Sequence, residues 1–164
     1  MNSAKRRRQL PGLLFATLLA CVALAACARE TGYTLQIIRT AGNELVASIP
    51  VSTGLEFSLD YTHSVSNTPV TGEFLVTADA RIRPTVTRFD AFGPGLPWTP
   101  GTEHVTDTDG RIVYTHDDEA RDELLLWVSE LTRETVRVGE TTIQLYAPGG
   151  QYERVLIRIE GRSR

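Results

Sequence analysis

Glu56-Phe-Ser-Leu-Asp-Tyr-Thr-His-Ser-Val65 alternates apolar and polar side chains along its whole length. Because successive side chains of a strand point to opposite faces, this pattern is typical of a strand with one buried face. The apolar face carries Phe57, Leu59, Tyr61, His63 and Val65. The stretch therefore predicts that the His63 ring points inward and that the adjacent Ser64 points away from it.

The chain on both sides of this stretch also indicates β structure, because short segments rich in Val, Ile, Thr, Phe and Tyr are separated by Gly, Pro, Asn and Asp. We expect strands at residues 33–39, 44–49, 56–65, 73–80, 83–89, 111–115, 135–138, 141–146 and 152–160. Residues 118–133 fit either a helix or a buried strand. The pattern predicts one all-β, antiparallel domain of about nine strands, either a β-sandwich or a barrel-like fold.

The beginning of the chain has the features of an export signal. A basic cluster, Lys5-Arg6-Arg7-Arg8, precedes an apolar run from Leu10 to Ala26. The run ends in Leu24-Ala25-Ala26-Cys27, which resembles a bacterial lipobox, in which the cysteine after the cleavage site is acylated. We therefore expect a lipoprotein signal peptide at 1–26, a lipidated tether at 27–32 and a β domain at 33–161. This predicts an extracytoplasmic protein that a lipid on Cys27 anchors to the bacterial membrane.

Three alternatives to this interpretation of the leader remain open. Ala23-Leu24-Ala25 also suits an ordinary secretory cleavage, which would release a soluble protein. Leu19-Ala20-Cys21 is a second lipobox-like sequence. An uncleaved anchor is the third alternative, although the apolar run is shorter than the ~20 residues that a membrane-spanning helix needs.

The composition after Cys27 excludes several classes of function. Cys21 and Cys27 are the only cysteines, so the predicted domain has no thiol for a disulfide, a thiolate metal site or a cysteine nucleophile. Four of the 17 basic residues lie in the leader, which leaves 13 against 20 acidic residues. This negative balance argues against nucleic-acid binding. We expect no metal and no cofactor.

Two motifs in the predicted domain resemble a known family. Tyr61-Thr-His-Ser-Val65, followed by Thr68-Pro-Val70, is similar to the signature of the bacterial family called domain of unknown function 1850. Phe89-Asp-Ala-Phe-Gly-Pro-Gly-Leu-Pro97 is similar to the second motif of that family. The resemblance implies a small exported protein of the kind often encoded beside TRAP-type solute transporters with TAXI-class binding proteins. It implies no reaction.

The candidate site residues come from these motifs and their surroundings. We expect a ligand-binding mouth formed by His63, Glu73, Arg88, Phe92 and Trp98. The other candidates are Tyr61, Ser64, Thr68, Pro69, Gly93 and Gly95. His63 fits equally the interpretation of a buried histidine satisfied by a backbone or hydroxyl partner. The segment 89–100 likewise fits a wide turn that caps the core with aromatic side chains.

Three functions are compatible with the sequence. The first hypothesis is a lipid-anchored, non-catalytic accessory protein whose partners are TRAP-type transporter subunits. The second is a binding module for a small ligand, such as a carboxylate. The third is a hydrolase, which the opposite directions of the His63 and Ser64 side chains disfavour.

Overall fold

The computed structural model describes residues 32–97 and 105–161, and the strands in these ranges pair in an antiparallel manner throughout. The chain divides into two units, Met1–Glu30 and Thr31–Arg164, and all of the described residues belong to the second unit. Within the described residues there are eleven strands and no helix. The strands are β1 (Tyr33–Arg39), β2 (Glu44–Val51), β3 (Glu56–Thr62), β4 (Pro69–Val76), β5 (Ile82–Phe89), β6 (Val105–Thr106), β7 (Ile112–Thr115), β8 (Glu123–Val128), β9 (Thr135–Val138), β10 (Thr141–Gln144) and β11 (Glu153–Gly161).

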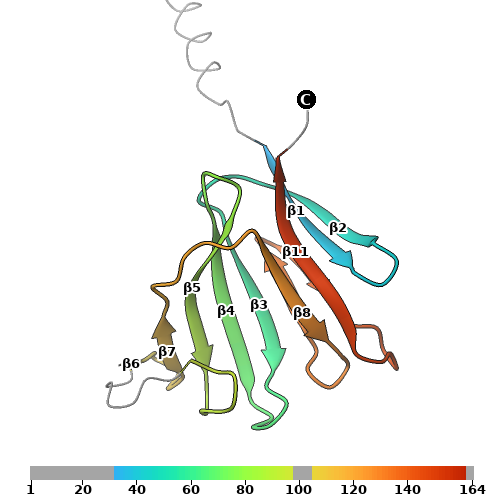
Figure 1. The fold of residues 1–164 in the computed structure, drawn as a ribbon. Helices are drawn as coiled ribbons and strands as arrows, with labels where there is room; N and C mark the ends of the chain where they lie inside the picture. The colour runs from blue at the N-terminus through green and yellow to red at the C-terminus, as the bar shows by residue number, and fades with distance from the viewer. Residues whose placement is uncertain (1–31, 98–104, 162–164) are drawn as a thin grey trace, which may run out of the picture. The chain divides into compact units, whose positions relative to one another are not determined.

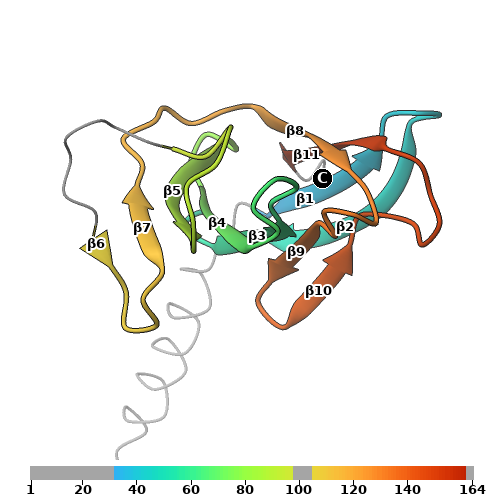
Figure 2. The same ribbon diagram turned by 90° about the horizontal axis from the view of Figure 1, so that it is seen from below.

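The strands form two sheets that pack as a β-sandwich (Figures 1 and 2). The smaller sheet has the order β2-β1-β11-β8, and the larger has the order β10-β9-β3-β4-β5-β7-β6. The predicted all-β fold is confirmed, and of the two architectures that we expected it is the sandwich and not the closed barrel. The connection from β7 to β8 carries the chain from the larger sheet to the smaller one (Figure 2).

The core lies between the two sheets and consists of the inward side chains of alternating strands. Leu35 and Ile37 of β1 and Val155 and Ile157 of β11 are fully buried from the smaller sheet. From the larger sheet the same cluster includes Phe57, Leu59, Val76, Ile82, Val136 and Val138. The period-2 pattern of the sequence therefore identifies the buried face of these strands correctly.

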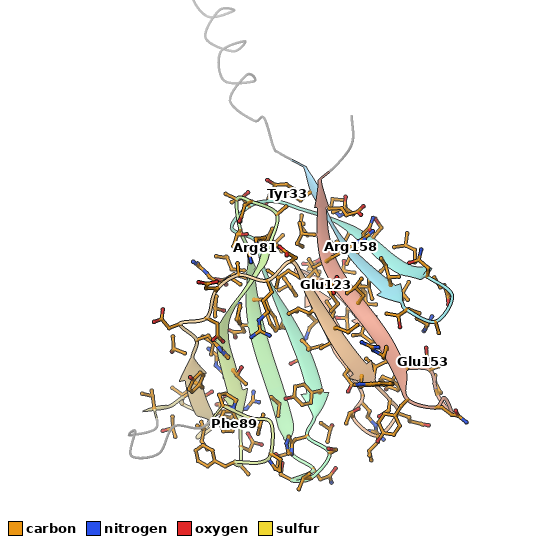
Figure 3. All side chains as sticks on the ribbon, in the orientation of Figure 1. Tyr33, Arg81, Phe89, Glu123, Glu153 and Arg158 are labelled. Atoms are coloured by element: carbon orange, nitrogen blue, oxygen red, sulfur yellow. The ribbon has the colours of Figure 1, made fainter. Side chains whose placement is uncertain are left out.

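The two ends of the described domain lie side by side. Tyr33, the first residue of β1, is paired with Gly161, the last residue of β11. Figure 1 shows the two strands meeting at this point. Figure 3 shows Phe89 of β5 toward the end of the sheets that is remote from Tyr33.

Several strand boundaries differ from the prediction, and β6 was not predicted. Strand β4 runs from Pro69 to Val76 and not from 73 to 80, because the chain turns after Val76, where the Ala80 N–H donates to the Thr77 carbonyl oxygen at 3.2 Å. Strand β3 ends at Thr62, not at residue 65, because the chain turns there: the Asn67 N–H donates to the His63 carbonyl oxygen at 2.8 Å. As a result Val65 is 71% exposed, and its predicted inward direction is wrong. Strand β2 continues through Pro50 to Val51. A proline has no N–H to donate to a neighbouring strand, and this is tolerated here because β2 lies at the edge of its sheet.

The ambiguous segment 118–133 contains a strand. Leu124, Leu126 and Val128 face the core while Leu125 is exposed, so the observed period is 2. The segment from Glu123 to Val128 is paired with β11 along its whole length. No helical segment with the length and apolar character of a membrane span occurs among the described residues.

Candidate functional site

The two sequence motifs meet at the side chain of His63. This residue is 6% exposed, and its ring lies against Gly93 of the second motif. A β-carbon on residue 93 would come within 2.5 Å of the ring carbon Cε1. The His63 Nε2 atom is 3.0 Å from the carbonyl oxygen of Pro94. His63 therefore holds the loop after β5 against the end of β3.

The hydrogen bonds determine which ring nitrogen of His63 carries the proton. The backbone N–H of Ser66 donates to Nδ1 at 3.1 Å, so Nδ1 must accept. The Pro94 carbonyl oxygen can only accept, so Nε2 must donate to it. His63 is thus a neutral imidazole with the proton on Nε2. Its partners are those of the buried, satisfied histidine that was one of our two interpretations.

The residues of the first motif that follow His63, from Ser64 to Pro69, form the turn around it. Ser64 is exposed, and Pro69 is the exposed first residue of β4. The carbonyl oxygen of Thr68 accepts from the His63 N–H at 2.8 Å. Its hydroxyl oxygen is 2.7 Å from that of Ser66.

The second motif closes one end of the sandwich. Leu96 is buried against Val70 and Phe89 in a small second cluster. The Phe92 ring packs edge-on against that of Phe89, with ring centroids 5.4 Å apart, and Phe92 is 41% exposed. Gly95 has a φ of +84°, which a side chain would strain. The described part of segment 89–100 thus has the contacts of a wide turn that caps the core, which was one of the two expectations for it.

The predicted mouth is not assembled. Glu73 and Arg88 form an ion pair with each other, and Thr71 and Asp60 bond beside them on the same face of β3 and β4. This is the outer face of the larger sheet, because Gly72 and Phe74 point inward. Glu73 and Arg88 therefore lie on the opposite side of the sheet from the His63 ring. Trp98, like Cys27, lies outside the described residues.

A cavity of about 400 Å³ opens instead between the two sheets. Its walls are largely apolar and come from strands of both sheets and from the connection between β7 and β8. The lining residues are Leu59, Tyr61, Val70, Gly72, Phe74, Pro84, Thr87, Gly95, His116, Asp118, Arg121, Leu124, Leu126, Trp127 and Glu134. Gly72 faces inward without a side chain, and the Phe74 ring lies against it, 3.1 Å from the place that a β-carbon would take. Of the predicted residues that the structure describes, Tyr61 and Gly95 line this cavity.

One polar end of the cavity is formed by Tyr61 and Glu134. Glu134 is 6% exposed, and its Oε2 accepts the backbone N–H of Ser129 at 3.0 Å. The pairing of Asp60 with Thr135 places Tyr61 and Glu134 next to each other on the inner face. Burial, and then the negative charge of Glu134, raises the pKa of the Tyr61 hydroxyl above its ordinary value of 10.0.

A second polar group of the cavity is a chain of three side chains. The Thr87 hydroxyl oxygen is 2.8 Å from Nε2 of His116, and Nδ1 of His116 is 2.8 Å from a carboxylate oxygen of Asp118. A carboxylate can only accept, so Nδ1 carries a proton and donates it to Asp118, and Nε2 shares a hydrogen bond with the Thr87 hydroxyl. Hydroxyl, imidazole and carboxylate stand in the order of a catalytic triad, with a secondary alcohol as the hydroxyl.

The comparison with protein families agrees with the two sequence motifs. A family model described as Domain of unknown function (DUF1850) matches residues 57–145, which are 89 of the 164 residues. The protein belongs to the DUF1850 family. No curated protein and no solved structure matches the chain.

The DUF1850 match includes all of the described residues that line the cavity and leaves out β1, β2 and β11. The sequence pattern did not identify Thr87, His116, Asp118 and Glu134 as residues of one site. One signal was available for Glu134: it has the same parity as the inward residues Val136 and Val138, and a charge on an inward face is unusual. No local signal joins Thr87 to His116, which is 29 residues further along the chain.

Proposed function

We propose that this DUF1850 protein is a non-catalytic, extracytoplasmic domain that binds a small ligand in the cavity between its two sheets. The observation that carries the proposal is the cavity itself. Small-molecule sites are typically concave, mostly apolar, and supplied with a few converging polar groups. The cavity has a volume of about 400 Å³, aliphatic and aromatic walls, and polar groups on Tyr61, Glu134, Thr87 and His116.

The test fills the cavity from one wall. Leu126 of β8 is half-buried and lines the cavity, so Leu126→Trp places an indole in the ligand volume. Leu125→Trp is the matched control, because Leu125 is on the opposite face of the same strand and is 45% exposed. A set of small amines, alcohols and carboxylates is screened by shifts of the backbone amide NMR signals of β3, β4 and β8.

We expect at least one probe to shift these signals in the native protein and in Leu125→Trp, and not in Leu126→Trp. If no probe shifts them, or if the Leu126→Trp protein responds as the native protein does, the cavity is not a ligand site. Both proteins should unfold cooperatively, which a thermal melt verifies before the screen.

The lipid anchor and the transporter partnership are the second part of the proposal. The sequence around Cys27 supports the anchor, and the resemblance to proteins encoded beside TRAP-type transporters supports the partnership. A domain held near the membrane is well placed to pass a solute to a transporter or to sense its occupancy. This role is independent of the identity of the ligand.

Co-purification tests the partnership. Full-length tagged protein is isolated from native membranes beside a Cys27→Ala variant, which lacks the acylated residue. We expect transporter subunits to accompany the native protein and to be lost from the variant. Recovery of the native protein without transporter subunits would contradict the accessory role and leave the ligand-binding proposal standing.

A further inference from the structure

The carboxylate of Glu134 carries the most information about what the cavity can hold. Glu134 is more than nine-tenths buried, with an exposed fraction of 6%, and it lines the cavity. Its position follows from the register, because Glu134 directly precedes β9 and shares the inward parity of Val136 and Val138. The rest of that inward row is apolar.

No cation neutralises this carboxylate within residues 32–97 and 105–161. The ion pairs of the described residues do not include Glu134, and its one side-chain hydrogen bond is the N–H of Ser129 on Oε2. A buried carboxylate is costly unless it is paired and hydrogen-bonded. One backbone N–H satisfies part of this requirement and leaves Oε1 for another donor.

Arg121, the arginine that lines the cavity, is attached to the sheets at a distance from Glu134. Tyr61 is paired with Val70, whereas Arg121 bridges to Ile82, which is paired with Val76. Six residues along β4 separate these two rows, which is roughly 20 Å at about 3.3 Å per residue. The end of the cavity at Tyr61 and Glu134 is therefore negative.

The Tyr61 hydroxyl adds a second oxygen beside the carboxylate. Its raised pKa reflects burial first and the charge of Glu134 second, so it stays protonated and can accept a hydrogen bond through its lone pairs. The nearby walls are the apolar side chains of Leu59, Val70 and Leu126. An oxygen-lined negative end with apolar walls suits a cation that carries N–H groups and an apolar body.

We propose that the cavity binds a small organic ammonium ion, with its N–H groups on the Glu134 carboxylate and the Tyr61 hydroxyl and its apolar body against Leu59, Val70 and Leu126. This proposal rests on the ligand-binding function proposed above and specifies its chemistry. It replaces the carboxylate ligand that the sequence suggested, because Arg88, the cation of the predicted mouth, is paired with Glu73 on the outer face.

Three probes of the same shape and different charge test the proposal: benzylamine, benzyl alcohol and benzoate. Their dissociation constants are measured by amide NMR shifts at neutral pH with the intact domain. We expect benzylamine to bind at least about tenfold more tightly than benzyl alcohol, and benzoate to bind most weakly. Glu134→Gln should lose most of the preference for benzylamine, and Tyr61→Phe should lose part of it.

The controls separate charge from folding. Glu134→Gln retains an oxygen for the Ser129 N–H, so the turn from 129 to 134 keeps its hydrogen bond. Glu140→Gln changes an exposed carboxylate in the turn before β10 and should bind as the native protein does. Binding of benzyl alcohol or benzoate at least as tight as that of benzylamine would overturn the ammonium proposal and leave the cavity as a ligand site. An unchanged preference in Glu134→Gln would overturn it as well. If none of the three probes binds, both the ammonium proposal and the proposed ligand-binding function fail.

Discussion

The His63 imidazole lies directly on the α-carbon of Gly93, at a place where an added β-carbon would be 2.5 Å from Cε1. This contact joins the end of β3 to the loop that follows β5. Both residues belong to motifs by which the sequence resembles the DUF1850 family, and both lie in the segment that the family model matches. Gly93 is thus needed for close packing and not for an unusual backbone angle.

Gly93→Ala should destabilise the domain. The new methyl group would overlap the His63 ring, and a forced overlap of this kind typically costs about 1–3 kcal/mol. The free energy of unfolding in urea measures the effect. Gly161→Ala is the control, because no atom lies within 4 Å of the β-carbon position at Gly161. Equal stability of the two variants would mean that the ring moves aside at no cost.

His63→Leu should destabilise the domain by removing both ring nitrogens. The Ser66 N–H and the Pro94 carbonyl would then lose their partners, at about 0.5–1.5 kcal/mol for each hydrogen bond lost. Urea unfolding provides the measurement. The exposed neighbour serves as reference, since Ser64→Ala should change stability by less than about 0.5 kcal/mol. A small effect of His63→Leu would show that water replaces both bonds.

Tyr61 should make the domain sensitive to alkali. The pKa of its hydroxyl is raised in the folded state, so above the ordinary value of 10.0 the unfolded chain loses this proton first. The native state then binds more protons than the unfolded state, and stability falls as the pH rises. The contribution is complete below pH 10.0 and is lost as the pH passes through the folded-state pKa. The free energy of unfolding in urea should fall less steeply for Tyr61→Phe than for the native protein between about pH 9 and about pH 11. If the stability of the two proteins falls with the same slope, the loss of stability at alkaline pH comes from groups other than Tyr61.

The chain of Thr87, His116 and Asp118 should support no hydrolysis. Its hydroxyl belongs to a threonine within β5, and we assign the three groups to positioning the connection between β7 and β8 over the cavity. The native protein and Thr87→Val should release p-nitrophenol from p-nitrophenyl acetate at the same rate at every protein concentration. Turnover that disappears in Thr87→Val would make the protein an enzyme and overturn the non-catalytic role.

Thr87→Val should nevertheless have a structural effect. Valine keeps the shape of threonine and removes the hydroxyl group, which leaves Nε2 of His116 without this partner. The loss of one such hydrogen bond is expected to cost about 1 kcal/mol in urea unfolding. An unchanged free energy of unfolding would indicate that His116 finds another donor.

The inward and outward directions of side chains could be predicted where the strand pairing is regular. The prediction failed where the register of the pairing shifts. Val155, Ile157 and Ile159 alternate in the sequence and are buried as expected. In β2 the pairing shifts, because Ile37 is opposite Ala47 and Ile38 is opposite Leu45. Val46 is the extra residue of a β-bulge, and the side chain of Leu45 next to it is 54% exposed. A slip of this kind depends on the partner strand and leaves no mark in the local pattern.

The site was less predictable than the fold, because it depends on which residues the topology brings together. His63 and Gly93 were separate candidates from the two motifs, and the structure brings them into contact, where they pack against each other. Glu73 and Arg88 were expected in a mouth with His63, and the strand alternation that identified the core places them on the outer face of the sheet. The cavity depends on the crossing of the connection after β7 and on the inward parity of Glu134, which come from separate parts of the chain.

The pairing of Tyr33 with Gly161 has a mechanical consequence. A pulling force applied between the two ends of the domain would act on a single rung, at the end of the β1–β11 ladder. The hydrogen bonds would then break one after another, as in a zipper, instead of sharing the load as in shear. The domain should therefore open at low force from its ends in an optical trap, and it should resist far more when it is pulled from Tyr33 and from the far end of β11.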